Sequence, residues 1–509
     1  MNKKFTAILL ALLMSVPTVF TACSQSTDNA AKDDAGANAA NTAQTPSAEV
    51  EEVETEPERL YADVPADADF GGGTFTILCS SNAEYGTVKD DFFAEELNGE
   101  PINDARFNRN VTVGDKLNVK IQTEDLPTGS DQGKNAVTND VKSGSGTYDL
   151  AFCCGYATSQ LSTNNYLYNL KNVPYINLEA PWWDQVANKD LQILGQLFYT
   201  TGDISTADND ATYCIMFNKQ LITDYNLENP YDLVGDDKWT MDNFIKMAEQ
   251  VHEDTNGNGQ VDREDLFGVM IWDDSMMGIV NCTGEKCCSV GDDGLLTLTL
   301  YSETTVDAVT KFLDFALQKD IADAYQRTNW DDTWLVTKFS QNETLFLMQL
   351  IQIVPKMREM ENDFGILPYF KYTEGQEKYY TTIGSWHSVF MCVPNNGCDL
   401  NRTGIVTECL ANEGLYDLTV AYYEKTLVGK VSRDSDSEAM LDIIFANRVY
   451  DMGWYFAIGG YNESVMNLLR NYRNEFTSMF TSAQKMANKV LQKTNDAFTA
   501  AYEEANANP

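Results

Sequence analysis

The sequence predicts an α/β fold in which helices cover a parallel sheet. Three apolar segments of strand length alternate with two segments at helical spacing, namely residues 74–78, 102–117, 119–122, 135–141 and 148–153. A further amphipathic helix leads into an apolar strand within residues 240–271. Strands that alternate with helices pair in parallel, because the connection between two parallel strands needs about a dozen residues.

The size and composition of the chain limit its class. Its 509 residues are 43% hydrophobic and 11% aromatic, enough for a large core divided between two or three lobes. The 36 basic and 76 acidic residues give a net charge of -40. Such a surface repels nucleic acid and anionic lipid headgroups and attracts divalent cations, so we expect no nucleic-acid partner.

The first residues carry a targeting signal. Two lysines precede an apolar run at residues 8–14, and small residues then lead to Cys23. This pattern resembles a bacterial lipoprotein signal peptide, which implies cleavage after residue 22, a lipid on Cys23 and a place on the outer face of the cytoplasmic membrane. An ordinary secretory leader that is cut elsewhere is the alternative. No later stretch reaches the roughly eighteen apolar residues needed to span a bilayer.

The segment after this signal has a different composition. Residues 23–68 are rich in Ala, Asn, Thr and acidic residues and have almost no large apolar side chains. Because such a segment cannot build a core, we expect a disordered acidic tether here. The folded part of the chain should then occupy residues 69–509.

Polar residues follow two of the predicted strands. Glu84 and Tyr85 come after the first strand, and Gly155 and Tyr156 come after the third. In open α/β sheets, ligands bind beyond the carboxyl ends of the strands. We therefore expect Glu84 and Tyr156 to lie at a binding site.

The segment 240–251 predicts an amphipathic helix. Thr240 precedes it as an N-cap, and Asp242 falls in its first turn, near the positive end of the helix dipole. Apolar residues recur at helical spacing, namely Met241, Phe244, Ile245, Ala248 and Val251. Residues 266–271 then predict a buried strand.

Between this helix and this strand lies a calcium-loop pattern. Asp254 opens the pattern, Gly259 permits the sharp turn at its centre, and Asp265 closes it where the pattern has Glu. The predicted metal ligands are Asp254, Asn256, Asn258, Gln260, Asp262 and Asp265. Because a strand follows instead of a second helix, we expect a structural Ca2+ rather than a switch. A solvated Asn/Gly turn without metal is the alternative.

Several motifs along the chain resemble those of one known family. They lie at residues 148–151, 213–219, 239–240, 339–346, 363–368 and 478–498. In their order and spacing they are similar to those of the family 1 extracellular solute-binding proteins, the lipoprotein components of carbohydrate ABC importers. The resemblance covers about residues 70–500.

The resemblance implies a two-lobed, periplasmic-binding-protein-like fold of type II, with a ligand cleft between the lobes. Lobe I would comprise about residues 69–203 with parts of 340–400, and lobe II residues 204–339 with the C-terminal helices. The chain would cross between the lobes near residues 201–204 and return near 339–348. The resemblance further implies a monomeric receptor that binds a carbohydrate, here expected to be an oligosaccharide, and delivers it to an ABC transporter permease.

Aromatic and polar residues at several positions are candidates for contact with such a solute. Sugars present apolar C–H faces and a rim of hydroxyl groups, so their receptors combine aromatic platforms with planar hydrogen-bonding groups. The candidate ligand-binding residues are Trp386, Trp272, Asp273, Tyr156, Glu84, Asp203 and Trp330. For each tryptophan, packing in the core is the alternative.

The chain lacks the common motifs of catalytic sites. It has no H-E-x-x-H, no G-x-S-x-G, no phosphate-binding loop and no dinucleotide fingerprint. A pair of carboxylates for glycoside hydrolysis carries no weight among 76 acidic residues, and the only histidines are His252 and His387. We therefore expect a binding protein and not an enzyme. A glycan-binding adhesin or sensor at the cell surface, or a polysaccharide-degrading enzyme, is the alternative.

Overall fold

The computed structural model describes residues 59–80, 92, 94–126, 129–324, 332–357, 360–423 and 435–507. The chain divides into two units, Met1–Tyr61 and Ala62–Pro509. The expected signal peptide, most of the expected tether and Cys23 lie outside the described residues, as do Glu84 and Trp330. All described helices and strands belong to the second unit.

The second unit contains a first sheet of four strands. Their order is β12 (Val389–Cys392), β3 (Leu150–Cys154), β1 (Gly73–Ser80) and β2 (Val119–Asp125). Strand β1 pairs in parallel with β2 and β3, as the alternation of strands and helices predicts. The expectation of a purely parallel sheet is wrong at β12, which runs antiparallel to β3. Strand β12 enters this sheet from the second sheet without a crossover helix, so the parallel rule does not apply to it.

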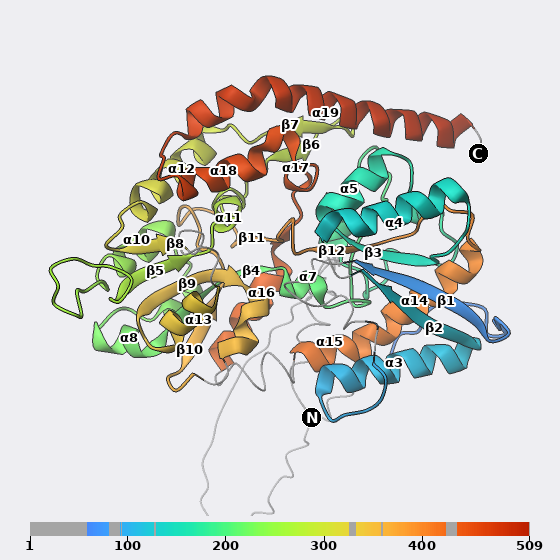
Figure 1. Cartoon of the computed structure of the whole chain (residues 1–509), viewed down its shortest axis with the longest axis horizontal. Helices are drawn as coiled ribbons and strands as arrows, with labels where there is room; N and C mark the ends of the chain where they lie inside the picture. Colours follow the sequence, from blue (N-terminus) through green and yellow to red (C-terminus); the bar gives the residue numbers. More distant parts are fainter. Residues whose placement is uncertain are drawn as a thin grey trace, which may run out of the picture. The chain divides into compact units, whose positions relative to one another are not determined.

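Helices cover both faces of the first sheet (Figure 1). On one face lie α4 (Gly129–Ser143) and α5 (Gly155–Thr163), and on the other α3 (Pro101–Leu117) and α14 (Leu400–Tyr416). Helix α3 begins at a proline, and the Glu100 side chain accepts a hydrogen bond of 2.9 Å from the Asn103 backbone N–H. The bounds of α3 lie within one residue of those predicted from the sequence.

A second sheet has five strands. Their order is β10 (Phe364–Leu367), β4 (Tyr213–Asn218), β9 (Thr344–Leu350), β5 (Phe267–Ile271) and β8 (Ala322–Ala324). Strand β5 is parallel to β8 and β9, whereas β4 is antiparallel to β9 and β10. The sheet is therefore mixed, and its strands are almost wholly buried.

Helix α10 (Met241–Ala248) precedes β5, as predicted. The Thr240 hydroxyl caps this helix by accepting a hydrogen bond of 3.3 Å from the Asn243 backbone N–H, and Asp242 lies in its first turn. Other helices on this half are α8 (Lys219–Asp224), α9 (Pro230–Gly235), α11 (Ser275–Asn281), α12 (Glu303–Ala316), α13 (Asp332–Ser340) and α16 (Ser435–Ala446).

Two segments of the chain connect the two sheets. Residues 200–212 lead from the first sheet to β4, and residues 383–391 lead back to the first sheet and include most of β12. The segments pair through isolated bridges, Thr200 to Met391 and Thr212 to Ile383. The return expected near residues 339–348 is wrong, because these residues lead into β9 of the second sheet. A short apolar strand that is buried on both faces has the same pattern in either sheet, so sequence alone misplaced it.

The C-terminal part covers both halves of this unit. Helix α14 packs on α3 of the first half, while α16 packs on β10 and α18 (Tyr461–Arg470) packs on α11 in the second half. The closing helix predicted at residues 478–498 is confirmed as α19 (Phe476–Ala507), which runs along α12 and α18 towards α5 (Figure 1). Among the described residues, no helix combines the length and the apolar character required to cross a membrane.

The remaining elements of the described residues are short. They are α6 (Gln185–Asp190), α7 (Ala207–Asp210), α15 (Leu418–Val420), α17 (Met452–Tyr455), the 3-10 helices η2 (Leu170–Asn172), η4 (Ile351–Met357) and η6 (Ile458–Gly460), the strand pair β11 (Thr381–Thr382) with β13 (Arg448–Val449), and the strand pair β6 (Cys288–Val290) with β7 (Leu296–Leu298). Because β11 and β13 adjoin the second connecting segment, the junction between the sheets is built from parts of the chain that are far apart in sequence.

Candidate functional site

The hydroxyl of Tyr156 lies where the two halves meet. Tyr156 is in the first turn of α5, directly beyond the carboxyl end of β3. Its hydroxyl accepts a hydrogen bond of 2.9 Å from Ser385 Oγ and one of 2.7 Å from Asn462 Nδ2. Ser385 precedes β12 in the chain, and Asn462 lies in α18 on the second half. The sequence-predicted Tyr156 thus joins α5, the returning segment and α18.

Gly155 lets these elements approach closely. A Cβ atom at this position would lie 2.8 Å from the ring of Tyr455, 3.0 Å from Ser388 Oγ and 3.1 Å from the Ser385 carbonyl oxygen. A side chain at residue 155 would push the returning segment away from α5. The glycine after β3 therefore serves to seat Tyr156 against Ser385.

Trp386 lies beside Tyr156. The centroids of the two rings are 5.9 Å apart, and the ring planes are inclined by 59°. The indole is only half-buried, so part of it faces solvent. Two of the predicted ligand-contacting aromatic residues therefore share one surface at the junction.

Two consecutive acidic residues follow β5 on the second half. Asp273 is fully buried and forms an ion pair with Nε of Arg470 in α18. Nη1 of the same guanidinium lies 2.8 Å from Glu463 Oε2, and the Glu463 side chain is 60% exposed. Asp274 is buried next to Asp273. Three carboxyl groups thus surround one arginine at this end of the sheet.

Burial governs the protonation of the two aspartates. Burial raises the pKa of Asp273 to about 6, against the opposing effect of the Arg470 charge. Burial also raises the pKa of Asp274 well above its ordinary value, and the neighbouring Asp273 carboxylate raises it further. The pair therefore holds a proton more readily than two exposed carboxylates would, and a cation next to it would release that proton.

Trp272 is buried and packs against residues of the junction. Its side chain is only 4% exposed. The indole meets Tyr213 edge-on at 5.4 Å and His387 at 5.1 Å between ring centroids. Burial lowers the pKa of His387 to about 4, so this imidazole is neutral at pH 7. The alternative of core packing describes the position of Trp272, whereas Trp386 has the partly exposed face that a platform needs.

Asp203 belongs to a second polar network, at the other connecting segment. It accepts a hydrogen bond of 2.6 Å from Thr419 Oγ1, and burial raises its pKa to about 7. Nearby, Arg448 binds Asp208 at 2.9 Å and Asp184 at 2.5 Å. This network ties the segment before β4 to β13. The structure therefore does not group Asp203 with Tyr156 and Trp386.

Sequence reasoning missed three residues of the junction, Asn462, Glu463 and Arg470. Glu463 and Arg470 are seven positions apart, which places them on one face of α18. A charged pair at this spacing is common on exposed helices and gives no sign of a site. Arg470 meets Asp273 across 197 positions of sequence, and no local pattern predicts that contact.

The loop between α10 and β5 follows the course that the calcium pattern requires. Asp254 Oδ1 accepts a hydrogen bond of 2.7 Å from the Gly257 backbone N–H, and Asp254 Oδ2 accepts one of 2.7 Å from Gly259 N–H. The two glycines have φ values of 71° and 89°, in the left-handed region. Asp265 is fully buried, and its carboxylate accepts hydrogen bonds from the backbone N–H of Thr255 (2.9 Å) and of Asp262 (2.8 Å).

The side chains of this loop have the oxygen atoms that a cation needs, but they do not converge on one point. In the described part of the chain, no three His, Cys, Asp or Glu side chains converge as metal ligands do. Asn258 Nδ2 instead donates a hydrogen bond of 3.0 Å to Asp262 Oδ2. A rotation of the Asn258 amide would present its oxygen, so the donor set suits Ca2+ even though the carboxylates are turned to the backbone.

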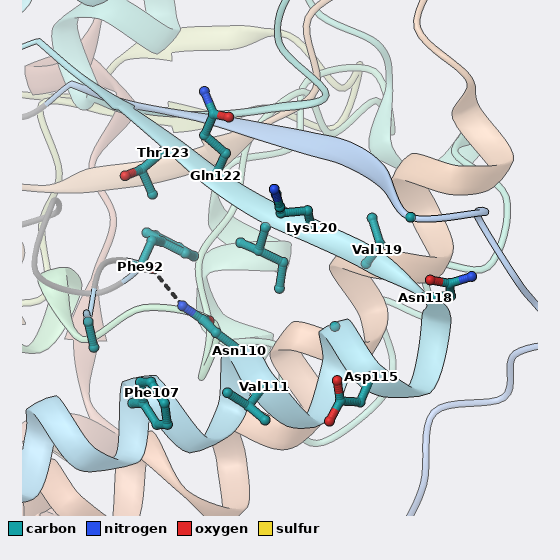
Figure 2. Close-up of a pocket in the computed structure, with 14 residues that line it drawn as sticks. Phe92, Phe107, Asn110, Val111, Asp115, Asn118, Val119, Lys120, Gln122 and Thr123 are labelled. Carbon is teal, nitrogen blue, oxygen red and sulfur yellow. Dashed lines mark hydrogen bonds between the residues drawn. The ribbon is translucent and has the colours of Figure 1, made fainter. Parts of the chain in front are cut away.

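A cavity of about 620 Å³ lies between β2 and α3 (Figure 2). At its edge, Asn110 Nδ2 donates a hydrogen bond of 2.6 Å to the Phe92 carbonyl oxygen. None of the sequence-predicted site residues lines this cavity. Residues 81–91 and 93, which flank Phe92 in the chain, lie outside the described residues, so we assign no ligand to it.

Comparison with known proteins gave one family match. The family model described as bacterial extracellular solute-binding protein matches residues 114–389, more than half of the chain. A search of curated protein sequences found no match.

Solved structures show the same fold at low sequence identity. An ABC transporter solute-binding protein from Thermotoga lettingae, bound with α-D-tagatose, is 13% identical with a TM-score of 0.53, and the match covers 83% of this chain and 100% of that one. For the GacH receptor of Streptomyces glaucescens, studied with acarbose, the identity is 13%, the TM-score 0.51, and the coverage 84% and 97%. An ABC substrate-binding protein of Listeria monocytogenes in complex with cycloalternan is 10% identical with a TM-score of 0.50, and the match covers 84% of this chain and 99% of that one.

Proposed function

Because the chain belongs to the family of bacterial extracellular solute-binding proteins, we propose that it is a receptor that captures a carbohydrate of oligosaccharide size and delivers it to an ABC transporter permease. It binds its solute without chemical change and acts as a monomer. The carbohydrates bound to the relatives from Thermotoga, Streptomyces and Listeria support this class of solute.

One observation carries the proposal, namely the partly exposed aromatic surface of Trp386 beside Tyr156 at the junction of the two sheets. A sugar ring stacks its C–H face on such a surface, and the hydroxyl rim then meets planar polar groups. Arg470, Glu463 and Asn462 supply those groups from α18.

The proposed mechanism is a shift between open and closed arrangements of the two halves. A solute that contacts both halves only when they are closed binds that state more tightly and so increases its population. The paired segments 200–212 and 383–391 connect the halves and would act as the hinge. The permease would then recognise the closed receptor.

The leader supports anchoring at the outer face of the cytoplasmic membrane through a lipid on Cys23. The acidic segment 23–68 would hold the receptor away from the bilayer as a tether. A Ca2+ ion in the loop between α10 and β5 would support the second half, held by oxygens of Asp254, Asn256, Asn258 and Asp262.

The test is thermal melting of the intact protein against panels of monosaccharides, oligosaccharides, peptides and polyamines. A saturable rise of Tm with one class of sugar, with that sugar recovered intact, is the expected result. A rise accompanied by cleavage of the sugar would indicate an enzyme, and no rise with any sugar would contradict the proposed function.

A further inference from the structure

Among the described residues, carboxyl groups outnumber guanidinium groups at the junction. Asp273, Asp274 and Glu463 provide three carboxyl groups, and Arg470 provides a guanidinium that contacts Asp273 and Glu463. The adjacent His387 is neutral at pH 7. A solute with a phosphate or carboxylate group would be repelled here, because its charge would meet the carboxylate excess at short range.

Several buried oxygen atoms near these carboxyl groups have no hydrogen-bond partner among the described residues. They include the hydroxyl of Tyr213, which is fully buried, Oδ1 of Asn462, a residue that is 5% exposed, and the hydroxyls of Ser275 and Tyr369. The Tyr213 hydroxyl points towards the returning segment, since it would lie 3.6 Å from a Cβ atom at Gly384. Burial, and after it the Asp274 carboxyl group, raises the pKa of this hydroxyl well above its ordinary value.

Asn462 adds an acceptor on the other side of the junction. Its Nδ2 donates a hydrogen bond to the hydroxyl of Tyr156, and its Oδ1 remains free to accept a hydrogen bond from a ligand. A buried acceptor without a partner costs free energy, which a ligand that supplies donors would recover. Asn462 Oδ1 can only accept a hydrogen bond, whereas the hydroxyls of Tyr213, Ser275 and Tyr369 can accept or donate.

The aromatic surface suits the same kind of ligand. The ring centroids of Trp386 and Tyr156 lie 5.9 Å apart. The face of an indole attracts a cation as well as a C–H group. A neutral sugar hydroxyl supplies one donor and leaves the proton on the Asp273–Asp274 pair. A protonated amine supplies three donors and one positive charge.

We propose that the solute is an amino sugar, whose protonated amine is received by the Asp274 carboxyl and the Asn462 carbonyl oxygen, with Glu463 at the exposed rim. This inference rests on the proposed function, because it names the class of carbohydrate for the same site. It goes beyond the family, since the charge balance belongs to residues of this chain.

The test is isothermal titration of the intact protein at low salt with glucosamine, N-acetylglucosamine and glucose, and with the β-1,4-linked tetramer of each. N-acetylation removes the charge and keeps the sugar, so the ratio of the two dissociation constants isolates the amine. We expect the amine form to bind at least about tenfold more tightly than the acetylated form. Rising salt should reduce this ratio.

Matched variants assign the effect to the residues named. In Asp274→Asn the preference for the amine should fall to near unity, and in Glu463→Gln it should fall in part. Glu463 is 60% exposed, so this second variant keeps the test valid if Asp274→Asn does not fold. Glu503→Gln, at an exposed position of α19, is the matched control and should keep the full preference.

The outcomes separate this inference from the proposed function. Neutral sugars that bind as tightly as their amine forms, or a preference that survives Asp274→Asn, would overturn the amino-sugar assignment and leave the carbohydrate receptor intact. Binding of spermidine without binding of any sugar would overturn the carbohydrate proposal itself.

Discussion

The side-chain amide of Asn462 donates a hydrogen bond of 2.7 Å to the hydroxyl of Tyr156. The bond joins α18 on the second half to α5 on the first. In the mechanism proposed above, opening of the halves would break this bond. The same hydroxyl accepts from Ser385 of the returning segment, so one oxygen atom connects three parts of the chain.

Tyr156→Phe should weaken solute binding about fivefold. The variant keeps the ring beside Trp386 but removes the acceptor of the Asn462 hydrogen bond between α18 and α5, which has a net value of about 1 kcal/mol. The closed arrangement loses stability relative to the open one, and the apparent affinity falls with its population. Isothermal titration measures the effect. Tyr175→Phe, at a position 41% exposed, is the control, and equal affinities in both variants would contradict a role for this contact in closure.

Trp386→Ala should mainly weaken solute binding, whereas Trp272→Ala should mainly lower folding stability. Trp386 is partly exposed, so its truncation should weaken binding by about 1 to 3 kcal/mol with little change in Tm. Trp272 is 4% exposed, so its truncation leaves a cavity and should cost about 3 to 5 kcal/mol of folding stability. Denaturant unfolding and titration of both variants test this contrast. A Trp272→Ala variant that is stable but has lost affinity for the solute would show that Trp272 contacts the solute.

The contrast between the tryptophans shows what sequence can establish here. Elements with local signals were found: Thr240 caps α10, Pro101 opens α3, and α19 follows its apolar spacing. Tyr156 was proposed as a site residue because ligands bind beyond the carboxyl ends of strands, and the structure places its ring beside that of Trp386. Whether Trp272 or Trp386 keeps a free face depends on which distant residues pack on it, and no local pattern contains that information.

Contacts between distant parts of the chain account for what sequence missed. The ion pair between Arg470 and Asp273 depends on the packing of α18 against α11. Residues of β9 were expected in the segment that returns to the first sheet, because their apolar side chains fit either sheet. Asp203 lies within the connecting segment 200–212, and its carboxylate accepts a hydrogen bond from Thr419 in a network with no sequence signal. Periodicity reports which face of an element is buried and not which element buries it.

Folding stability should increase as pH falls from 8 to 5, and Glu408 should account for part of the increase. Glu408 is buried and accepts hydrogen bonds of 3.0 Å from the indole N–H groups of Trp182 and Trp183. Burial raises its pKa to about 7. A carboxyl group whose folded pKa is raised contributes stability that is full below the unfolded pKa and is lost as pH rises through the folded value.

Glu408→Gln should therefore flatten the dependence of the unfolding free energy on pH by about 2 kcal/mol between pH 5 and pH 8. Urea unfolding at several pH values measures it. Asp203 and Asp208, with pKa values raised by burial to about 7 and about 6, leave a residual dependence of the same sign. Glu503→Gln, at an exposed site, should retain the full slope. A slope that Glu408→Gln leaves unchanged would place the titrating groups elsewhere.

Removal of calcium should lower Tm through the loop between α10 and β5. A ligand that binds only the folded state at a concentration a thousandfold above its Kd stabilises it by about 4 kcal/mol. Asp254→Ala also removes the backbone hydrogen bonds to Gly257 and Gly259, so its Tm alone does not report on metal. The decisive quantity is the difference between Tm in Ca2+ and Tm in chelator, which should be large in the wild type and near zero in Asp254→Ala. The equivalent substitution at Asp293, which lies in an exposed turn before β7, should keep the difference. Equal Tm values with Ca2+ and with chelator in the wild type would show that the Asn258–Asp262 hydrogen bond, and not a cation, holds this loop.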